Sequence, residues 1–204
     1  MEYSQFEKAI KEGNLEQVQL LIEPLLLASE PDTQYEIAEM LVGTGYLKEA
    51  DQILQHIQFL FPEEAQIKID RAHLLMEIDQ EDEALLLLSS IEPHEELYTQ
   101  ALLSLADYYQ MQGFYEAAEQ RINQALDLMP DEPLLKFAKA ELMLETGKYL
   151  EAVRLYEELK RDQDEIASIR LSERLAEVLT AGAAYEDALP YYEESLDHHV
   201  TPDL

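Results

Sequence analysis

Apolar residues recur along the chain at helical spacing, in stretches that are separated by short turns. Before Gly45, for example, Ile37, Met40 and Leu41 follow the three-and-four spacing that places side chains on one face of a helix. Ile53, Leu54 and Ile57 show the same kind of spacing after Gly45. Glycine, the residue that most often ends a helix, stands in most of these turns. No run alternates in the manner of a strand. The pattern predicts pairs of helices joined by tight turns.

Alanine recurs with a period of 34 residues, and each repeat carries two alanines that are twelve residues apart. The pairs are Ala38 with Ala50, Ala72 with Ala84, Ala106 with Ala118, Ala140 with Ala152 and, in a last repeat with the same internal spacing, Ala176 with Ala188. Phe6 and Val18 mark a degenerate first repeat. A fixed period of this length is typical of stacked repeat proteins. A small residue at two facing places, one on each helix, lets the paired backbones approach closely.

Three segments around the second alanines resemble the tetratricopeptide repeat family, whose unit is a 34-residue antiparallel helix pair. They are Gly45–Ala50 with Pro62, Gln112–Ala118 with Pro130, and Thr146–Ala152 with Tyr156. The similarity covers about residues 31–198. Three features depart from the family pattern: no repeat begins with tryptophan, the first repeat lacks the alanines, and the third has Asp79 for glycine and Glu81 for the usual aromatic residue.

The resemblance and the period together predict an all-α, right-handed solenoid of about six antiparallel helix hairpins. We expect one elongated domain over residues 1–204, with repeat units at about 1–30, 31–64, 65–98, 99–132, 133–166 and 167–204. Each unit should contact only its neighbours. We expect a bacterial protein of many such repeats, or the N-terminal portion of one.

The charge of the chain excludes several classes of partner. There are 44 acidic against 14 basic residues, a formal net charge of −30, which opposes binding to nucleic acid and to anionic membrane surfaces. The chain has no cysteine, so neither disulfides nor thiolate metal sites can form. Its start lacks the features of a signal peptide, and no apolar stretch is long enough to span a membrane. We expect a cytoplasmic protein whose many carboxylates serve as solvated surface, as salt adaptation, or as a binding site.

The resemblance implies that the first helix of each unit lines an inner groove where partners bind. The position one residue beyond the first alanine would face that groove, and five of its six residues are acidic. These six are Glu7, Glu39, His73, Asp107, Glu141 and Glu177. A mostly apolar column, three residues before the first alanine, would flank them: Tyr3, Tyr35, Ile69, Leu103, Phe137 and Glu173. Alternatively, these flanking side chains pack against the adjacent helix.

An acidic line with apolar flanks suits a basic, amphipathic segment of a partner protein. We therefore expect a protein-interaction adaptor or scaffold. The family's clamp for acidic chaperone tails is excluded, because its lysine and asparagine would fall on residues such as Tyr35 and Glu39. The alternative is a structural scaffold that self-assembles through its terminal hairpins. The last helix carries exposed apolar candidates for that contact, among them Leu189, and residues 201–204 resemble a turn into a further unit.

Catalytic and metal-binding motifs are lacking, so neither an enzyme nor a cofactor is expected. The segment His94–Tyr98 fails the two-histidine zinc motif, and a loose metal site at Asp197, His198 and His199 is disfavoured. Two local features give further expectations. Arg170 and Arg174 should form ion pairs within their own helix. The last helix should start near Glu186 or Asp187, because Pro190 is unfavourable in a helix interior.

Overall fold

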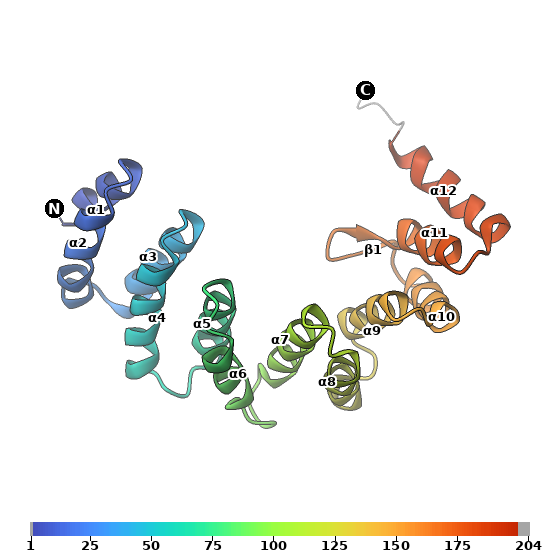
Figure 1. Ribbon diagram of the computed structural model, residues 1–204, viewed down its shortest axis with the longest axis horizontal. Helices are drawn as coiled ribbons and strands as arrows, with labels where there is room; N and C mark the ends of the chain where they lie inside the picture. Colours follow the sequence, from blue (N-terminus) through green and yellow to red (C-terminus); the bar gives the residue numbers. More distant parts are fainter. Residues whose placement is uncertain (1, 200–204) are drawn as a thin grey trace. The chain divides into compact units, whose positions relative to one another are not determined.

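The computed structural model describes residues 2–199 of the chain. These residues form twelve helices and one short β-hairpin (Figure 1). The helices are α1 (Glu2–Lys11), α2 (Leu15–Ala28), α3 (Pro31–Gly43), α4 (Leu47–Leu60), α5 (Ala65–Glu77), α6 (Glu81–Ser89), α7 (Tyr98–Met111), α8 (Tyr115–Leu128), α9 (Pro133–Glu145), α10 (Tyr149–Lys160), α11 (Leu171–Ala181) and α12 (Tyr185–His199). The strands are β1 (Glu165–Ile166) and β2 (Ile169–Arg170). The turn expected over residues 201–204 and the side chains of the 197–199 metal candidate lie outside the described residues.

Successive helices pack in antiparallel pairs, as the hairpin pattern predicts. Within pairs, α1 contacts α2, α3 contacts α4, α5 contacts α6, α9 contacts α10, and α11 contacts α12. Between pairs, α4 contacts α5, α8 contacts α9, and α10 contacts α11. The all-α solenoid of helix hairpins is therefore confirmed. The chain divides into two compact halves, one up to Ala101 and one from Leu102, and each half is described by itself.

The paired alanines lie at the contacts between the helices of a hairpin. All ten are buried, with no more than 2% of any of them exposed, and Phe6 and Val18 of the first hairpin are buried as well. A longer side chain at these positions would force the helices apart. Apolar residues around the alanines complete a core in each half, with members such as Ile37 and Leu41 in the N-terminal half and Leu142 and Tyr156 in the C-terminal half.

Each hairpin turn that joins a first helix to a second contains one residue in the left-handed backbone region. In four described turns this residue is glycine, as at Gly45, where φ is +83°. Asp79 takes the position in the third hairpin with φ +60°, and Ala183 takes it in the sixth with φ +61°. Aspartate tolerates this conformation better than alanine does. The neighbouring Gly182 has φ −79°, so the glycine of this turn is not at the position that needs one.

Replacing Ala183 by glycine is therefore expected to stabilise the protein by about 1 kcal/mol, because glycine has no Cβ to strain at positive φ. Denaturant unfolding followed by circular dichroism measures the change. Ala181→Gly, two residues earlier in α11, is the matched control and is expected to destabilise by about 0.5–1 kcal/mol. Equal effects of the two substitutions would contradict the assignment of strain to Ala183.

The last helix begins earlier than the sequence suggests. It starts at Tyr185 and contains Pro190 in its interior, so the expected late start was wrong. The turn at Ala183 fixes the start as in the other hairpins, with the Ala184 N–H donating to the Leu179 carbonyl oxygen over 2.8 Å. Because proline has no backbone N–H, Pro190 cannot donate to the carbonyl oxygen of Glu186, four residues earlier. Both residues are exposed. Water can satisfy that carbonyl, which lowers the cost of the proline.

The β-hairpin between α10 and α11 was not expected from the sequence. Glu165 pairs with Arg170 and Ile166 with Ile169 in antiparallel register. The two turn residues between the strands both have positive φ, which matches the right-handed twist of a tight hairpin. Ile166 is only 8% exposed and belongs to the core of the C-terminal half. Two-residue strands are too short to show alternation, so they leave no recognisable pattern in the sequence.

Among the described residues, the helices are all too short or too polar to cross a membrane. The same part of the chain contains no cluster of three or more histidine, aspartate or glutamate side chains that is placed to hold a metal ion.

Candidate functional site

A pocket of about 380 Å³ lies between α3 and α5 in the N-terminal half. It brings together three residues of the expected groove, namely Tyr35, Glu39 and His73. The complete lining is Tyr35, Ala38, Glu39, Val42, Gly43, Leu54, Asp70, His73, Leu74 and Glu77. Two of these acids, Asp70 and Glu77, were not among the residues expected from the sequence.

Helical periodicity explains why these side chains meet. Tyr35, Glu39 and Val42 are spaced by four and three residues, so they share one face of α3. Asp70 and Glu77 flank His73 at spacings of three and four on one face of α5. The floor of the pocket is apolar, with Ala38 1% exposed and Leu74 3% exposed. The two missed acids could have been found by extending the inner column of α5 by one turn in each direction.

The three carboxylates of this pocket differ in their contacts within the protein. The Tyr35 hydroxyl donates to Asp70 Oδ2 over 2.6 Å, and Gln66 Nε2 donates to Asp70 Oδ1 over 2.9 Å. Burial, together with the hydrogen bond to Asp70 and the nearby charge of Glu39, raises the pKa of Tyr35, which keeps the phenol neutral as a donor. Glu39 and Glu77 are exposed, and no ion pair is observed for either within the described part of the chain. The lining contains no lysine or arginine.

A second pocket of about 380 Å³ adjoins the first at Tyr35. Its lining comprises Pro31, Asp32, Tyr35, Ile57, Phe61, Glu64, Gln66 and Ile67. Phe61, at the end of α4, is 46% exposed and offers a large apolar surface. We refer to the two pockets together as the α3–α5 groove. Both ends of this groove combine apolar side chains with carboxylates. The second pocket adds the aromatic ring of Phe61, and the first, which we call the acidic end, has three carboxylates in its lining.

Two of the expected groove residues belong to the core instead. Ile69 is completely buried, and Phe137 is only 6% exposed. Phe137 packs edge to face against Tyr156, with ring centroids 6.0 Å apart. For these two positions the expectation of an accessible groove side chain was wrong, and the alternative of packing against the neighbouring helix holds. Their column lies at the boundary between groove and core, where a small rotation of the helix decides which side a residue faces.

The remaining expected residues lie outside the α3–α5 groove. On α1, Tyr3 is 37% exposed and Glu7 is half-buried. On α7, Leu103 is half-buried and Asp107 is exposed. None of these four lines either pocket of the groove.

In the C-terminal half, the acids of the expected column are paired within the chain. The Tyr156 hydroxyl donates to Glu141 Oε1 over 2.6 Å, and Arg174 Nε lies 3.0 Å from the same oxygen. Arg174 Nη1 also donates to Glu177 Oε2 over 2.6 Å. The pair of Arg174 with Glu177 is the one expected within the helix. Arg170 Nη1 lies 3.9 Å from Glu173 Oε1, but Arg170 belongs to β2 and precedes α11, so this pair is not within the helix as expected. The contact between Arg174 and Glu141 joins two helices and was missed.

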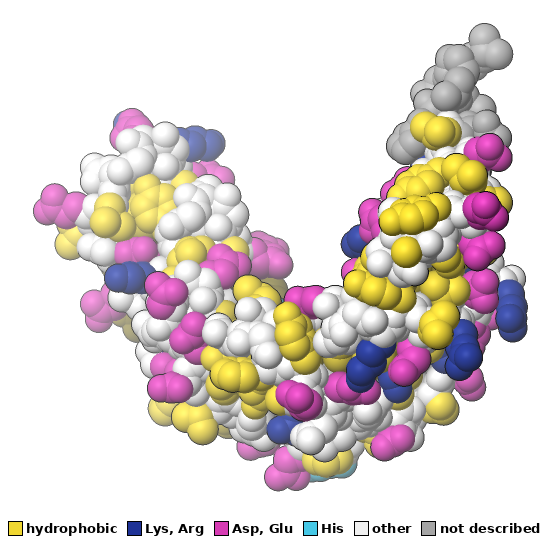
Figure 2. Space-filling model, turned by 45° about the vertical axis from the view of Figure 1, so that its right-hand side comes forward, with side chains coloured by type: hydrophobic (Ala, Val, Ile, Leu, Met, Phe, Trp, Pro, Cys, Tyr) yellow, Lys and Arg dark blue, Asp and Glu magenta, His cyan; other side chains and the backbone are white. Residues whose placement is uncertain are grey.

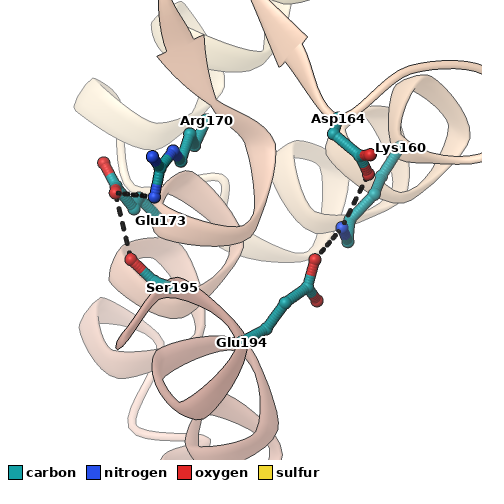
Figure 3. A network of polar contacts seen from close by, with 6 residues as sticks. All are labelled: Lys160, Asp164, Arg170, Glu173, Glu194 and Ser195. Carbon is teal, nitrogen blue, oxygen red and sulfur yellow. Dashed lines mark hydrogen bonds and ion pairs between the residues drawn. The ribbon is translucent and has the colours of Figure 1, made fainter. Parts of the chain in front are cut away.

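A second polar network ties the last helix to its neighbours (Figure 3). Lys160 at the end of α10 bridges Glu194 of α12, at 2.5 Å, and Asp164, at 3.3 Å. Ser195 of α12 donates to Glu173 of α11 over 3.0 Å. Although burial lowers the pKa of Lys160, its hydrogen bonds to the two carboxylates raise it, and the net direction is upward. The basic residues of this region therefore serve to neutralise local carboxylates.

Acidic side chains are spread over the visible face of both halves (Figure 2). The acidic end of the α3–α5 groove combines three carboxylates with a lining that has neither lysine nor arginine. It is therefore the candidate site for a positively charged ligand.

Comparison with known proteins places the chain among helical repeat proteins. A family model described as "Tetratricopeptide repeat protein 21 ARM repeat" matches residues 8–112, and one described as "YpiA-like, tetratricopeptide repeats" matches residues 110–164. The TPR repeat-containing protein YpiA of Bacillus subtilis (strain 168) is 35% identical over 166 residues, which cover 81% of this chain. The chain spans 39% of the length of that relative.

Solved structures with low sequence identity share the fold. PilW, a type IV pilus biogenesis factor, gives a TM-score of 0.71 at 14% identity, covering 99% of this chain and 94% of PilW. A tetratricopeptide repeat protein from Parabacteroides merdae gives 0.68 at 17% identity, covering 96% of this chain and 78% of that protein. MamA gives 0.62 at 15% identity, with 79% and 93% covered. At these identities the likeness concerns the fold alone.

Proposed function

The chain belongs to the tetratricopeptide repeat family, and from this premise we propose that its N-terminal half binds a basic, amphipathic segment of a partner protein. The family fold is that of a protein-interaction scaffold. The α3–α5 groove carries the proposal, because its acidic pocket has three carboxylates and neither lysine nor arginine in its lining. We propose no catalytic role and no cofactor. We further propose that the six repeat units act as one cytoplasmic domain.

The groove would use two kinds of contact. An apolar side chain of the partner would enter the pocket beside Phe61, while a lysine or arginine would lie between Glu39 and Glu77. Buried apolar anchors supply most of the affinity in such interfaces, and exposed charges supply specificity and faster association. The C-terminal half is a weaker candidate for the same role, since Arg174 already neutralises Glu141 and Glu177.

A charge-matched pair of variants tests the site. Glu39→Gln combined with Glu77→Gln is expected to weaken binding of a labelled helical peptide of leucine and lysine by about 10-fold at low salt, and by less at high salt, because salt screens exposed charges. Fluorescence anisotropy measures the affinity. Circular dichroism confirms that each variant is folded.

The control is Glu116→Gln combined with Glu151→Gln, which removes the same charge from exposed positions on α8 and α10. Its affinity for the peptide is expected to stay within about 2-fold of the unmodified protein, because these residues lie outside the groove. If both double variants weaken binding equally, the peptide responds to net charge alone, and the α3–α5 groove is not its site.

A further inference from the structure

The last helix exposes a continuous apolar stripe that the groove does not use. Its four members are spaced by four, three and four residues, so they follow one face of α12. They are Tyr185, Leu189, Tyr192 and Leu196, which are 63%, 59%, 42% and 61% exposed. Hydrophobic side chains are visible over this last part of the described chain (Figure 2). Four large exposed residues in a row form an apolar patch of the kind that marks interaction sites.

We propose that this stripe, the α12 seam, binds an amphipathic helix of a partner protein that presents aliphatic residues and an arginine. The α12 seam is a different surface from the α3–α5 groove, and its role does not depend on the function proposed for the groove. The support comes from within the chain, where α12 can be compared with the corresponding helix of the preceding hairpin.

In the preceding hairpin, the corresponding face of the second helix, α10, is covered by the next helix, α11. Counting from the paired alanines, Tyr149, Val153, Tyr156 and Lys160 of α10 correspond to the four residues of the α12 seam. Helix α10 contacts α11. Tyr156 is completely buried, whereas the corresponding Tyr192 is 42% exposed. The other three residues of α10 are half-buried, whereas their counterparts on α12 are exposed.

Helix α11 shows which side chains cover this face. Leu171, Leu175 and Val178 are all completely buried, and they share a core with Tyr156. The backbone of α11 approaches α10 closely at its end, since a Cβ added to Gly182 would lie 3.3 Å from the Tyr149 Cβ. The natural ligand of such a face is therefore a helix with aliphatic residues at spacings of four and three.

Arg174 adds the charged part of the pattern. It precedes Leu175, the second aliphatic residue of α11, and reaches back to Glu141 on the first helix of the preceding hairpin, 3.0 Å away. The residue that corresponds to Glu141 in the last hairpin is Glu177, whose side chain is 50% exposed. An arginine at the same place of a bound helix would share Glu177 with Arg174, whose Nη1 lies 2.6 Å from Glu177 Oε2. Glu186 and Glu193, which are exposed on α12, also favour a basic partner.

A second copy of the chain fits the α12 seam poorly. In a head-to-tail contact, α1 of the copy would take the place that α11 takes on α10. The position of Val178 is then occupied by Lys8, whose side chain is 73% exposed, and burying its ammonium group against apolar residues is unfavourable. Two seams placed face to face would bring Glu186 and Glu193 of both copies together, between chains of net charge −30.

A peptide based on α11 tests the inference. The probe has the sequence of residues 169–182 with Glu173→Lys and Glu177→Lys, and it carries a fluorescent label. The protein carries Glu39→Gln and Glu77→Gln, so that the α3–α5 groove contributes little to binding. We expect saturable binding to this full chain, and Leu189→Asp should weaken it about 10-fold or more, since a carboxylate would then face the apolar side of the helix. Arg174→Glu in the peptide should also weaken binding several-fold.

The control substitution is Leu86→Asp on α6, at a leucine that is 71% exposed and belongs to the other half. It should leave the affinity within about 2-fold. Circular dichroism checks that both variants are folded. If Leu189→Asp does not fold, Leu196→Asp provides a second variant of the seam. Absence of saturable binding, or equal binding by the seam variants, would overturn the proposal. So would sedimentation that shows a dimer which Leu189→Asp dissociates, because a second copy would then occupy the seam.

Discussion

Replacing Arg71 by methionine is expected to destabilise the N-terminal half by about 3 kcal/mol. The side chain of Arg71 is 4% exposed, and its guanidinium joins α5 to α4 and α6. Its Nε lies 2.7 Å from Asp51 Oδ1 on α4, its Nη2 lies 2.6 Å from Glu83 Oε1 on α6, and its Nη1 donates to Gln58 Oε1 over 2.8 Å. Methionine keeps much of the apolar stem and leaves both carboxylates without their cation. Water can reach Glu83, which is 45% exposed, so the cost falls at the lower end of the range for a broken buried pair.

Urea unfolding followed by circular dichroism measures this loss. Arg154→Met on α10, at an exposed arginine, is the matched control and should change the free energy of unfolding by less than about 0.5 kcal/mol. Arg71→Lys should fall between the two, because lysine keeps the charge but not the planar fork that serves three acceptors. A loss below about 1 kcal/mol for Arg71→Met would show that the three contacts contribute little.

Truncation of Tyr156 to alanine is expected to cost about 3–5 kcal/mol, the range for removing a large buried aromatic side chain. The ring is completely buried in the core of the C-terminal half and packs against Phe137. Tyr156→Phe separates the hydroxyl from the ring. It should cost about 1–2 kcal/mol, since Glu141 loses the hydroxyl but keeps Arg174.

The same tyrosine gives a dependence of stability on pH. Burial, together with the hydrogen bond to Glu141, raises the pKa of Tyr156 above its ordinary value of about 10. The folded state therefore holds the phenol proton more tightly than the unfolded state, and this stabilisation is fully present below about pH 10 and declines above it. Thermal unfolding at pH 8 to 11 should show a smaller alkaline loss for Tyr156→Phe than for the unmodified protein. Parallel losses would contradict this role of the hydroxyl.

The hairpins were predictable because their determinant is local and repeated. A close contact between two helices needs a small residue on each, and a period of 34 residues repeats that requirement through the alanine pairs. The exceptions depend on details that a pattern does not contain. Ala183 occupies a left-handed position one residue beyond the glycine of its turn, Pro190 is accommodated by exposure of the backbone around it, and the β-hairpin is too short to have a period.

The acidic pocket was partly predictable for the same reason. Glu39 and His73 were expected because each follows an alanine that faces its partner helix. Asp70 and Glu77 were missed because only one position per helix turn was considered. The burial of Ile69, beside the half-buried Tyr35 of the same column, depends on small differences in helix rotation. Pairing of Glu141 with Arg174 depends on where two neighbouring helices place long side chains, which sequence spacing alone does not specify.

The most direct test of the central proposal is to map the peptide site by nuclear magnetic resonance on the isotopically labelled chain. On titration with the basic amphipathic peptide, we predict that the largest backbone amide shifts cluster on α3 and α5 around Tyr35, Glu39, His73 and Glu77. In the Glu39→Gln, Glu77→Gln variant, the same shifts should need about 10-fold more peptide. Shifts spread evenly over exposed carboxylates of both halves, or confined to helices outside the α3–α5 groove, would contradict it.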